Sequence, residues 1–506
     1  MMGKKEELQI KNSFLYLIPI VTSNVLPFIA LPILTRILTT EDYGVLALAR
    51  IYAIFVNGVV HFAMTASYER NYFQYRNDRE NTAQLLYSTL LFVTLNFLVL
   101  ASVTYVFKPS ISTLIIGSPE YQHILFWAFC AQFLTGVSCY YFIFFKNTEN
   151  AQRYVSYTIA GNMMNFVLSL FLVAYVEVGV IGIIYAELCS GVLIFGMLSY
   201  KFARALEFSL NKSILRESLR ISYPLTPRIL FGVIGSQCDK YLIGLLASVG
   251  GVGTYSIGQK VSYMIATYMT AMYNVFSPRV YERMFEGKSD GGELIGRYLT
   301  PFVYVSIAVG FLVSLFSEEV ISILTPPSYH GAIDIVAILS VYYGLLFFGM
   351  VGGTQLMFAR KTYITSVISI VSIFLAVGLN VIFISKWGAI GAAWATLLAG
   401  VVSGSLYFAA AQHYYEIKWE YGRVLGICLT FVGGSVLGIF LRYVGVDYSF
   451  RILVKLIWIW LYVYIGMRSG VITGENVAMV KKILRELKMQ GTEEVSTRAG
   501  PKIGLG

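Results

Sequence analysis

Long apolar runs separated by short polar segments make up the chain from about residue 14 to residue 468. Most runs hold about 20 residues or more, the length that an α-helix needs to cross roughly 30 Å of hydrocarbon at about 1.5 Å per residue. The runs lack the strict alternation of a membrane β-barrel. The pattern therefore predicts an all-α integral membrane protein with about 14 transmembrane helices, at approximately 14–38, 44–66, 83–107, 122–145, 155–176, 178–200, 221–247, 252–276, 298–317, 332–356, 363–384, 387–411, 424–444 and 451–468.

A polar connection rich in basic residues divides these helices into groups. It covers residues 201–220 and falls between the sixth and the seventh predicted helix, where a linker between two bundles would lie. We therefore expect an N-terminal six-helix bundle at 1–200, a cytoplasmic linker at 201–220, a C-terminal six-helix bundle at 221–413, two additional membrane helices at 424–468 and a cytoplasmic tail at 469–506.

Composition supports a membrane protein and excludes several other classes. Apolar and aromatic residues make up 57% of the 506 residues and charged residues 13%, against about 45–50% and about 25% in soluble domains. A soluble chain of this length would need a polar shell that these residues cannot supply. A soluble enzyme and a disordered scaffold are therefore excluded. The five cysteines lie in apolar runs without ligand spacing, so we expect no metal site and no cofactor.

The distribution of basic residues predicts the orientation in the membrane. If the N-terminus is inside, 28 of the 38 Lys and Arg residues fall in inward segments and 5 in outward segments. Lys and Arg concentrate on cytoplasmic segments of membrane proteins. We therefore expect a multi-pass protein of the cell membrane with both ends in the cytoplasm. The net charge of +10 then reflects topology, and no nucleic-acid partner is implied.

Short glycine motifs recur along the chain at a separation of 209 residues. Gly44 and Gly253 both lie in outward turns, and Gly179 and Gly388 stand in the similar stretches VGVIGIIYAEL and WGAIGAAWATL. The offset maps the first six predicted helices onto the next six. Since six helices separate the copies, both enter the membrane from the same side, which predicts two pseudo-symmetric bundles. Transporters that work by alternating access are commonly built from such repeats.

The same turns carry a family resemblance that extends over about residues 10–470. The motifs are Arg36-Ile37-Leu38 followed by Glu41-Asp42-Tyr43-Gly44, Asp239-Lys240-Tyr241-Leu242-Ile243-Gly244, and Gly253-Thr254-Tyr255-Ser256-Ile257 with Lys260. With them the chain resembles the polysaccharide transport family, the oligosaccharide flippases of the multidrug/oligosaccharidyl-lipid/polysaccharide exporter superfamily. Two extra helices and a basic tail also fit this branch.

The resemblance implies a function and a set of partners. It implies a transporter that flips polyprenyl-diphosphate-linked oligosaccharide from the inner to the outer leaflet by alternating access. The product would feed the synthesis of a surface polysaccharide, such as O-antigen, capsule or exopolysaccharide. The implied partners are the lipid-linked oligosaccharide, membrane lipids, a polysaccharide polymerase and other assembly proteins.

Four basic residues inside predicted helices are the candidate substrate-binding groups. A charged side chain at bilayer depth costs at least about 2.5–3.5 kcal/mol on insertion scales and usually faces a cavity or a partner. Cations in a central lumen suit a diphosphate, and arginine adds a forked set of donors. A structural role remains the alternative. The candidates for this cationic lumen are Arg50, Arg228, Lys240 and Lys260.

Two acidic residues inside predicted helices are the candidates for ion coupling. Glu187 stands where the second repeat has Thr396, and Asp239 adjoins Lys240 but points about 100° away from it. Asp239 therefore needs a partner from another helix, with Lys260 or Arg50 as the expected cation. A structural ion pair and a coupling site are equally compatible with this pattern.

Missing motifs and short loops limit the alternative functions. The chain has no phosphate-binding loop, nucleophile elbow or zinc motif, so we expect a protein that is not an enzyme. A cation-coupled multidrug exporter of the same superfamily is the first alternative, but it would favour acidic over basic residues in the lumen. A membrane glycosyltransferase or polymerase is the second, and it would need a large outward loop with carboxylates.

Overall fold

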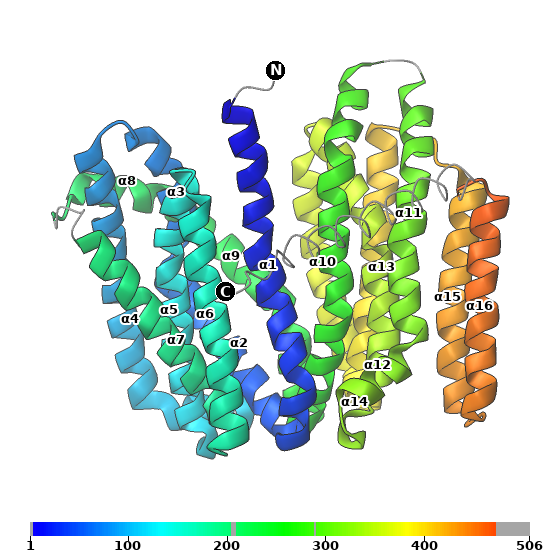
Figure 1. Cartoon of the computed structure of the whole chain (residues 1–506), viewed down its shortest axis with the longest axis horizontal. Helices are drawn as coiled ribbons and strands as arrows, with labels where there is room; N and C mark the ends of the chain where they lie inside the picture. Colours follow the sequence, from blue (N-terminus) through cyan, green and yellow to red (C-terminus); the bar gives the residue numbers. More distant parts are fainter. Residues whose placement is uncertain (1–3, 204–208, 288–289, 472–506) are drawn as a thin grey trace, which may run out of the picture. The chain divides into compact units, whose positions relative to one another are not determined.

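The computed structural model describes residues 4–203, 209–287 and 290–471, and this part of the chain is helical without a strand (Figure 1). Two compact units are formed, and neither is continuous in sequence. The first unit holds the described residues up to 264, 316–342 and 368–403, and the second holds 265–315, 343–367 and those from 404 onward.

Most helices belong to a single unit, and three long helices contribute to both. The helices of the first unit are α1 (Lys4–Ile37), α2 (Thr40–His61), α3 (Met64–Tyr75), α4 (Arg79–Ile116), α5 (Gln122–Asn147), α6 (Ala151–Leu170), α7 (Ile181–Ala203), α8 (Lys212–Ser222), α9 (Thr226–Leu246) and α12 (Ser317–Leu324). The second unit holds α11 (Gly291–Leu315), α15 (Tyr421–Tyr443) and α16 (Tyr448–Arg468), and the shared helices are α10 (Val249–Phe285), α13 (Ala332–Phe358) and α14 (Thr362–Tyr414).

The predicted all-α membrane fold is confirmed. Each predicted transmembrane segment coincides for most of its length with a helix, and 11 helices of the described chain are long and apolar enough to cross a membrane. The remaining three predicted spans have identifiable places. The apolar part of α1 is the shorter Val21–Ile37, α10 is interrupted by polar residues such as Lys260, and α14 contains two predicted spans in one element.

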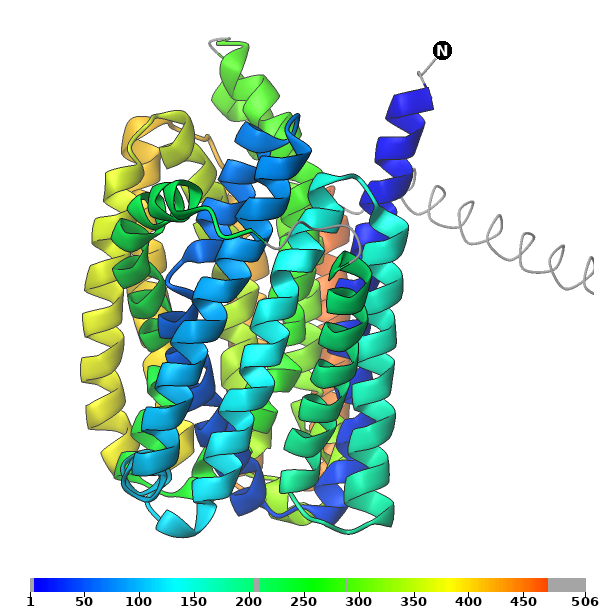
Figure 2. The same cartoon turned by 90° about the vertical axis from the view of Figure 1, so that its left-hand side faces the viewer.

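Two helices outside the predicted set shape the first unit. The α2 helix begins at a capping box in which Thr39 and Asp42 bond each other's backbone N–H, and it stops at Phe62 and Ala63, which both have positive φ. The chain then resumes as α3, where a single helix was expected. The predicted linker 201–220 contains α8, which lies across α3 and α4 (Figure 2). Residues 204–208 of this linker and residues 472–506 of the tail lie outside the described chain.

The repeat-related glycines Gly44 and Gly253 meet in the first unit. A Cβ atom built on Gly253 would lie 1.9 Å from the Thr40 carbonyl oxygen and 2.9 Å from the Gly44 nitrogen. A Cβ atom on Gly44 would lie 1.9 Å from the Val249 carbonyl oxygen. Only glycine permits so close a crossing. The α2 and α10 helices therefore cross backbone to backbone at the motif that revealed the repeat.

The second glycine pair shares a positive φ. Gly179 has φ +69° and Gly388 has φ +57°, values that favour glycine. At Gly179 the chain turns into α7, whereas at Gly388 it kinks within α14, where the sequence predicts a connection at 384–387. Both glycines of this repeat-related pair therefore mark a break between helical segments.

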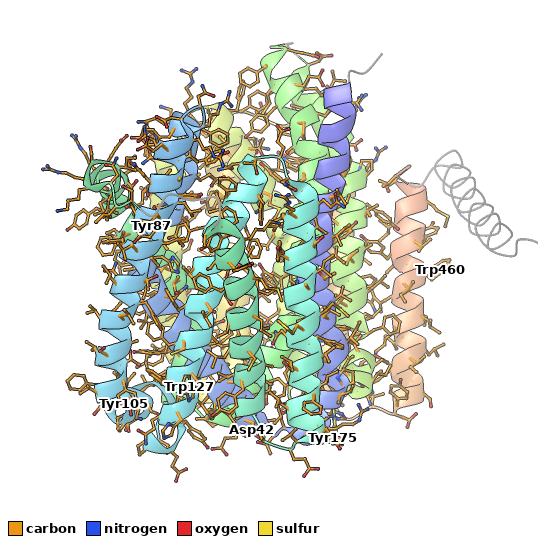
Figure 3. All side chains as sticks on the ribbon, turned by 60° about the vertical axis from the view of Figure 1, so that its left-hand side comes forward. Asp42, Tyr87, Tyr105, Trp127, Tyr175 and Trp460 are labelled. Atoms are coloured by element: carbon orange, nitrogen blue, oxygen red, sulfur yellow. The ribbon has the colours of Figure 1, made fainter. Side chains whose placement is uncertain are left out.

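One end of the first unit is closed by contacts between corners of the chain. The Tyr329 hydroxyl donates to the Leu38 carbonyl oxygen at 2.7 Å, and its ring meets the edge of Tyr43. The Thr35 hydroxyl reaches the Leu324 carbonyl oxygen at 3.1 Å. Figure 3 shows Asp42 and the aromatic residues Tyr105, Trp127 and Tyr175 toward one end of this unit, with Tyr87 toward the other. The aromatic residues match the belts that mark a membrane–water interface.

The second unit is organised around α11. The α15 helix packs on α11, and α16 packs on α15. Tyr304 and Tyr462 bond each other reciprocally, since each hydroxyl donates to the other's backbone carbonyl, at 3.2 and 2.6 Å. Phe311 meets the edge of Phe431 beside them. The two C-terminal membrane helices are thereby attached to a buried aromatic core.

Candidate functional site

The structure joins two predicted site residues that the sequence analysis had given different roles. Arg50 of α2 and Glu187 of α7 form an ion pair through the guanidinium Nη2 and the carboxylate Oε1. Both helices pack against α5, which holds the two side chains at the same level of the first unit. The Arg50 side chain is 42% exposed and the Glu187 side chain 26%. The pair is therefore accessible rather than sealed in a core.

Lys260 brings a second cation to this pair. Its Nζ donates to the Pro27 carbonyl oxygen of α1 at 3.2 Å, and its side chain is exposed. It lies within electrostatic range of both Arg50 and Glu187. These three residues, which we call the charged cluster, come from α2, α7 and α10 and carry a net charge of about +1 when all are ionised. A net positive charge on exposed side chains is suited to an anion.

Asp239 has different partners from the expected ones. Its carboxylate is buried and accepts hydrogen bonds from the Tyr255 hydroxyl at 2.5 Å and from the Gln259 amide at 3.4 Å. Within the described chain no cation lies within ion-pair distance of it, so the expected pairing with Lys260 or Arg50 is wrong. Neutral donors from α10 replace the cation because α10 directs Tyr255 and Gln259, one turn apart, toward α9.

The surroundings of Asp239 correspond to the charged cluster through the repeat. Arg50 maps onto Gln259 and Glu187 onto Thr396 at the offset of 209. Thr396 lies 3.4 Å from the Tyr255 hydroxyl, so the counterparts of the ion pair surround the carboxylate of Asp239. We call Asp239, Tyr255, Gln259 and Thr396 the acidic cluster. One repeat thus carries a charged pair where the other carries neutral groups around a buried acid.

The other two predicted cations lie apart from the charged cluster. The Lys240 ammonium donates to the Gln237 side chain on its own helix at 2.9 Å. Arg228 is exposed in the first turn of α9 and makes neither a hydrogen bond nor an ion pair within the described ranges. No bond in the described part of the chain joins either residue to Arg50, Glu187 or Lys260. The structure therefore brings together one half of the predicted cationic lumen.

Sequence reasoning did not include Tyr255 and Thr396 among the candidate site residues. Tyr255 is fully buried and holds Asp239, and it lies within the GVGTYSIGQK stretch that carried the resemblance. Thr396 was visible only as the neutral counterpart of Glu187. For metals, no group of three or more His, Cys, Asp or Glu side chains among the described residues is placed to hold an ion.

The chain has recognisable relatives among known proteins. It matches a protein family described as "Polysaccharide biosynthesis protein" over residues 10–283. The probable low-salt glycan biosynthesis flippase Agl15 of Haloferax volcanii is 23% identical over 258 residues, which are 50% of this chain and 52% of that protein. The chain therefore spans about half the length of that relative. The putative O-antigen transporter of Escherichia coli K12 is 20% identical over 70% of this chain and 85% of its own.

Solved structures show the same fold. The lipid II flippase MurJ in an inward closed conformation aligns with a TM-score of 0.65 at 16% identity, over 92% of this chain and 100% of its own. An inward-facing multidrug resistance transporter of the MATE family, from the MOP superfamily, aligns with a TM-score of 0.59 at 18% identity, over 77% and 94%. At these identities the likeness concerns the fold alone.

Proposed function

Because the chain belongs to the polysaccharide biosynthesis protein family, we propose that it flips a polyprenyl-diphosphate-linked oligosaccharide from the inner to the outer leaflet of the cell membrane. The observation that carries this proposal is the charged cluster, in which the Arg50–Glu187 ion pair and Lys260 together supply two cations and one carboxylate from membrane helices. Both residues lie within the stretch that matches the family. The names of the two relatives, a glycan biosynthesis flippase and an O-antigen transporter, support the same substrate class.

The physical requirement of such a substrate fits these residues. The diphosphate linkage carries negative charge that must leave water, and guanidinium and ammonium groups compensate that loss with charge-assisted hydrogen bonds. The apolar tail can remain in the bilayer while the head group passes. In this proposal Arg228 and Lys240 are further cations along the path, and Asp239 with its partners couples the cycle to an ion. A polymerase and other assembly proteins then use the flipped product.

A multidrug exporter is the second candidate, favoured by the fold it shares with the MATE transporter and by the buried carboxylate of Asp239. A cationic drug would require an acidic site. The exposed groups of the charged cluster are two cations and one acid, and the acid is already paired with Arg50. The electrostatics therefore favour an anionic head group over a cationic drug.

Replacing Arg50 or Lys260 by glutamine is expected to reduce flipping by about tenfold to a hundredfold, because a lost hydrogen bond between charged groups is worth roughly 1.5–3 kcal/mol. The measurement is the inward-facing pool of lipid-linked oligosaccharide in a strain without its own flippase. Arg297→Gln removes an exposed cation paired with Glu293 and is the matched control, expected to behave like the parent. Full restoration of surface polysaccharide by both Arg50→Gln and Lys260→Gln, at equal abundance, contradicts the proposed site.

The proposed orientation, with both ends in the cytoplasm, predicts which residues face outward. In a cysteine-free background, Ser118→Cys after α4 should react with a membrane-impermeant maleimide in intact cells. Ser213→Cys, which lies exposed on α8, should react only after the membrane is permeabilised. The reverse labelling pattern would invert the orientation and, with it, the direction of flipping.

A further inference from the structure

We propose that Glu187 is an internal counter-ion, a tethered anion that neutralises Arg50 when no substrate is carried and that the substrate's diphosphate displaces. This inference rests on the proposed function. It assigns a role to an acidic residue that lies in a site proposed to bind an anion through cations. It is carried by the Arg50–Glu187 ion pair and by the exposure of both side chains, which leaves Arg50 open to a second anion.

The first step is the competition for Arg50. The guanidinium Nη2 that faces Glu187 is one of the groups a diphosphate oxygen would use, and both acceptors are anionic oxygens. Since the Arg50 side chain remains 42% exposed, a ligand can approach it without unfolding the helices around it. Carboxylate and diphosphate are therefore alternative neutralising partners of one cation.

The second step is the place of Glu187 in the fold. It belongs to α7, and α7 and α2 both pack on α5, so the anion travels with the cation that it neutralises. Lys260 belongs to α10, which contributes to both units of the structure.

The third step is the charge of the site in the two halves of a cycle. Arg50 and Lys260 together carry about two positive charges, equal to the two negative charges of a diphosphate diester, so the displaced Glu187 leaves the loaded site with about one net negative charge. Without substrate, the same site would keep both charges at membrane depth, where unneutralised charge is costly. Glu187 neutralises one of these two positive charges. It therefore assists the return of the empty transporter more than the passage of the loaded one.

The repeat adds a reason to regard Glu187 as functional. At the equivalent positions of the other repeat, Thr396 replaces Glu187 and Gln259 replaces Arg50. Acid and base are thus present together in one repeat and absent together in the other. This pattern is expected of a neutralising pair, since either charge alone would be costly in the membrane.

The test compares net flipping with exchange in proteoliposomes. The probe is the native lipid-linked oligosaccharide, isolated from cells that lack this transporter and accumulate it. Net flipping into a leaflet initially free of the probe requires the empty transporter to return, whereas exchange between two loaded leaflets does not. For Glu187→Gln we expect net flipping to fall at least tenfold, exchange to stay within about twofold of the parent, and the apparent KM to decrease.

Two further variants separate this role from a structural one. Glu187→Asp keeps the charge and should restore part of the net flipping. Glu293→Gln removes a carboxylate from the exposed pair with Arg297 and should match the parent in both assays. An equal loss of exchange and net flipping in Glu187→Gln would assign a merely structural role, and no loss in either would also overturn the proposal. A parent protein that supports neither process would instead refute the proposed function.

Discussion

Replacing Gly253 by alanine is expected to destabilise the protein by about 1–3 kcal/mol or more and to abolish most of its flipping activity. The added Cβ would lie 1.9 Å from the Thr40 carbonyl oxygen, a distance that no side-chain rotation can relieve because both atoms are anchored to backbone. Overpacking of this kind forces backbone shifts that cost about 1–3 kcal/mol. The α2 and α10 helices would have to separate, and these helices carry Arg50 and Lys260.

The measurement is the thermal unfolding temperature of the purified protein together with flipping in proteoliposomes. Gly44→Ala should behave in the same way, since its Cβ would lie 1.9 Å from the Val249 carbonyl oxygen. Gly232→Ala is the matched control, because no atom lies within 4 Å of a Cβ built there and alanine favours a helix by about 1 kcal/mol. A Gly253→Ala protein as stable and active as the parent would show that the crossing loosens without cost.

The fold was predictable because the bilayer requires long apolar helices, and each such helix appears in the sequence as an apolar run of about 20 residues. Helices without such an apolar run were not predicted. The α3 helix is only 12 residues long and carries polar Glu69, Arg70 and Asn71. The α8 helix is only 11 residues long, but it is strongly amphipathic and Asn211 caps it. This local signal is missed by a search for long apolar runs, and the hydrogen bonds from Tyr75 and Gln74 to Glu217 are not visible in the local sequence at all.

The candidate site was predictable in its residues but not in its pairings. The cost of charge in the membrane singles out Arg50, Lys260, Glu187 and Asp239 from sequence alone. Which of them meet depends on how α7 and α9 are rotated about their axes, and this is set by packing. In the structure Arg50 therefore pairs with Glu187, while Asp239 accepts a hydrogen bond from Tyr255. The repeat says more about the pairings than the charges do, because its offset maps Arg50 and Glu187 onto Gln259 and Thr396 of the acidic cluster.

The Arg50–Glu187 pair of the first repeat and the acidic cluster of the second suggest a division of labour, although Lys260 of the charged cluster comes from the second repeat. The charged cluster is accessible and has a net positive charge, as binding of an anionic head group requires. The carboxylate of the acidic cluster is buried and, among the described residues, accepts hydrogen bonds from the Tyr255 hydroxyl, the Gln259 amide and the Lys240 backbone N–H but forms no ion pair. Such a carboxylate offers oxygen ligands to a small cation. Substrate binding and energy coupling would then use equivalent positions of one repeated scaffold.

If the acidic cluster couples flipping to an ion, Asp239→Asn should abolish the response to an ion gradient while leaving gradient-free equilibration of the substrate. One charge moved through 100 mV supplies about 2.3 kcal/mol, enough to drive roughly a 50-fold imbalance between leaflets. Asparagine keeps the shape of the side chain and an acceptor for the Tyr255 hydroxyl, but it removes the charge that the ion neutralises. We therefore expect the variant's imbalance to fall from that value to about one.

The assay uses proteoliposomes loaded with the native lipid-linked oligosaccharide, with a proton gradient in one series and a sodium gradient in the other. Tyr255→Phe removes the hydroxyl donor but keeps the carboxylate, so it should weaken the response without abolishing it. Asp447→Asn is the matched control, since Asp447 caps α16 and asparagine caps equally well. An Asp239→Asn protein that still accumulates substrate with either gradient would place the coupling site elsewhere. Of the two proposed roles, only substrate binding by the charged cluster would then remain.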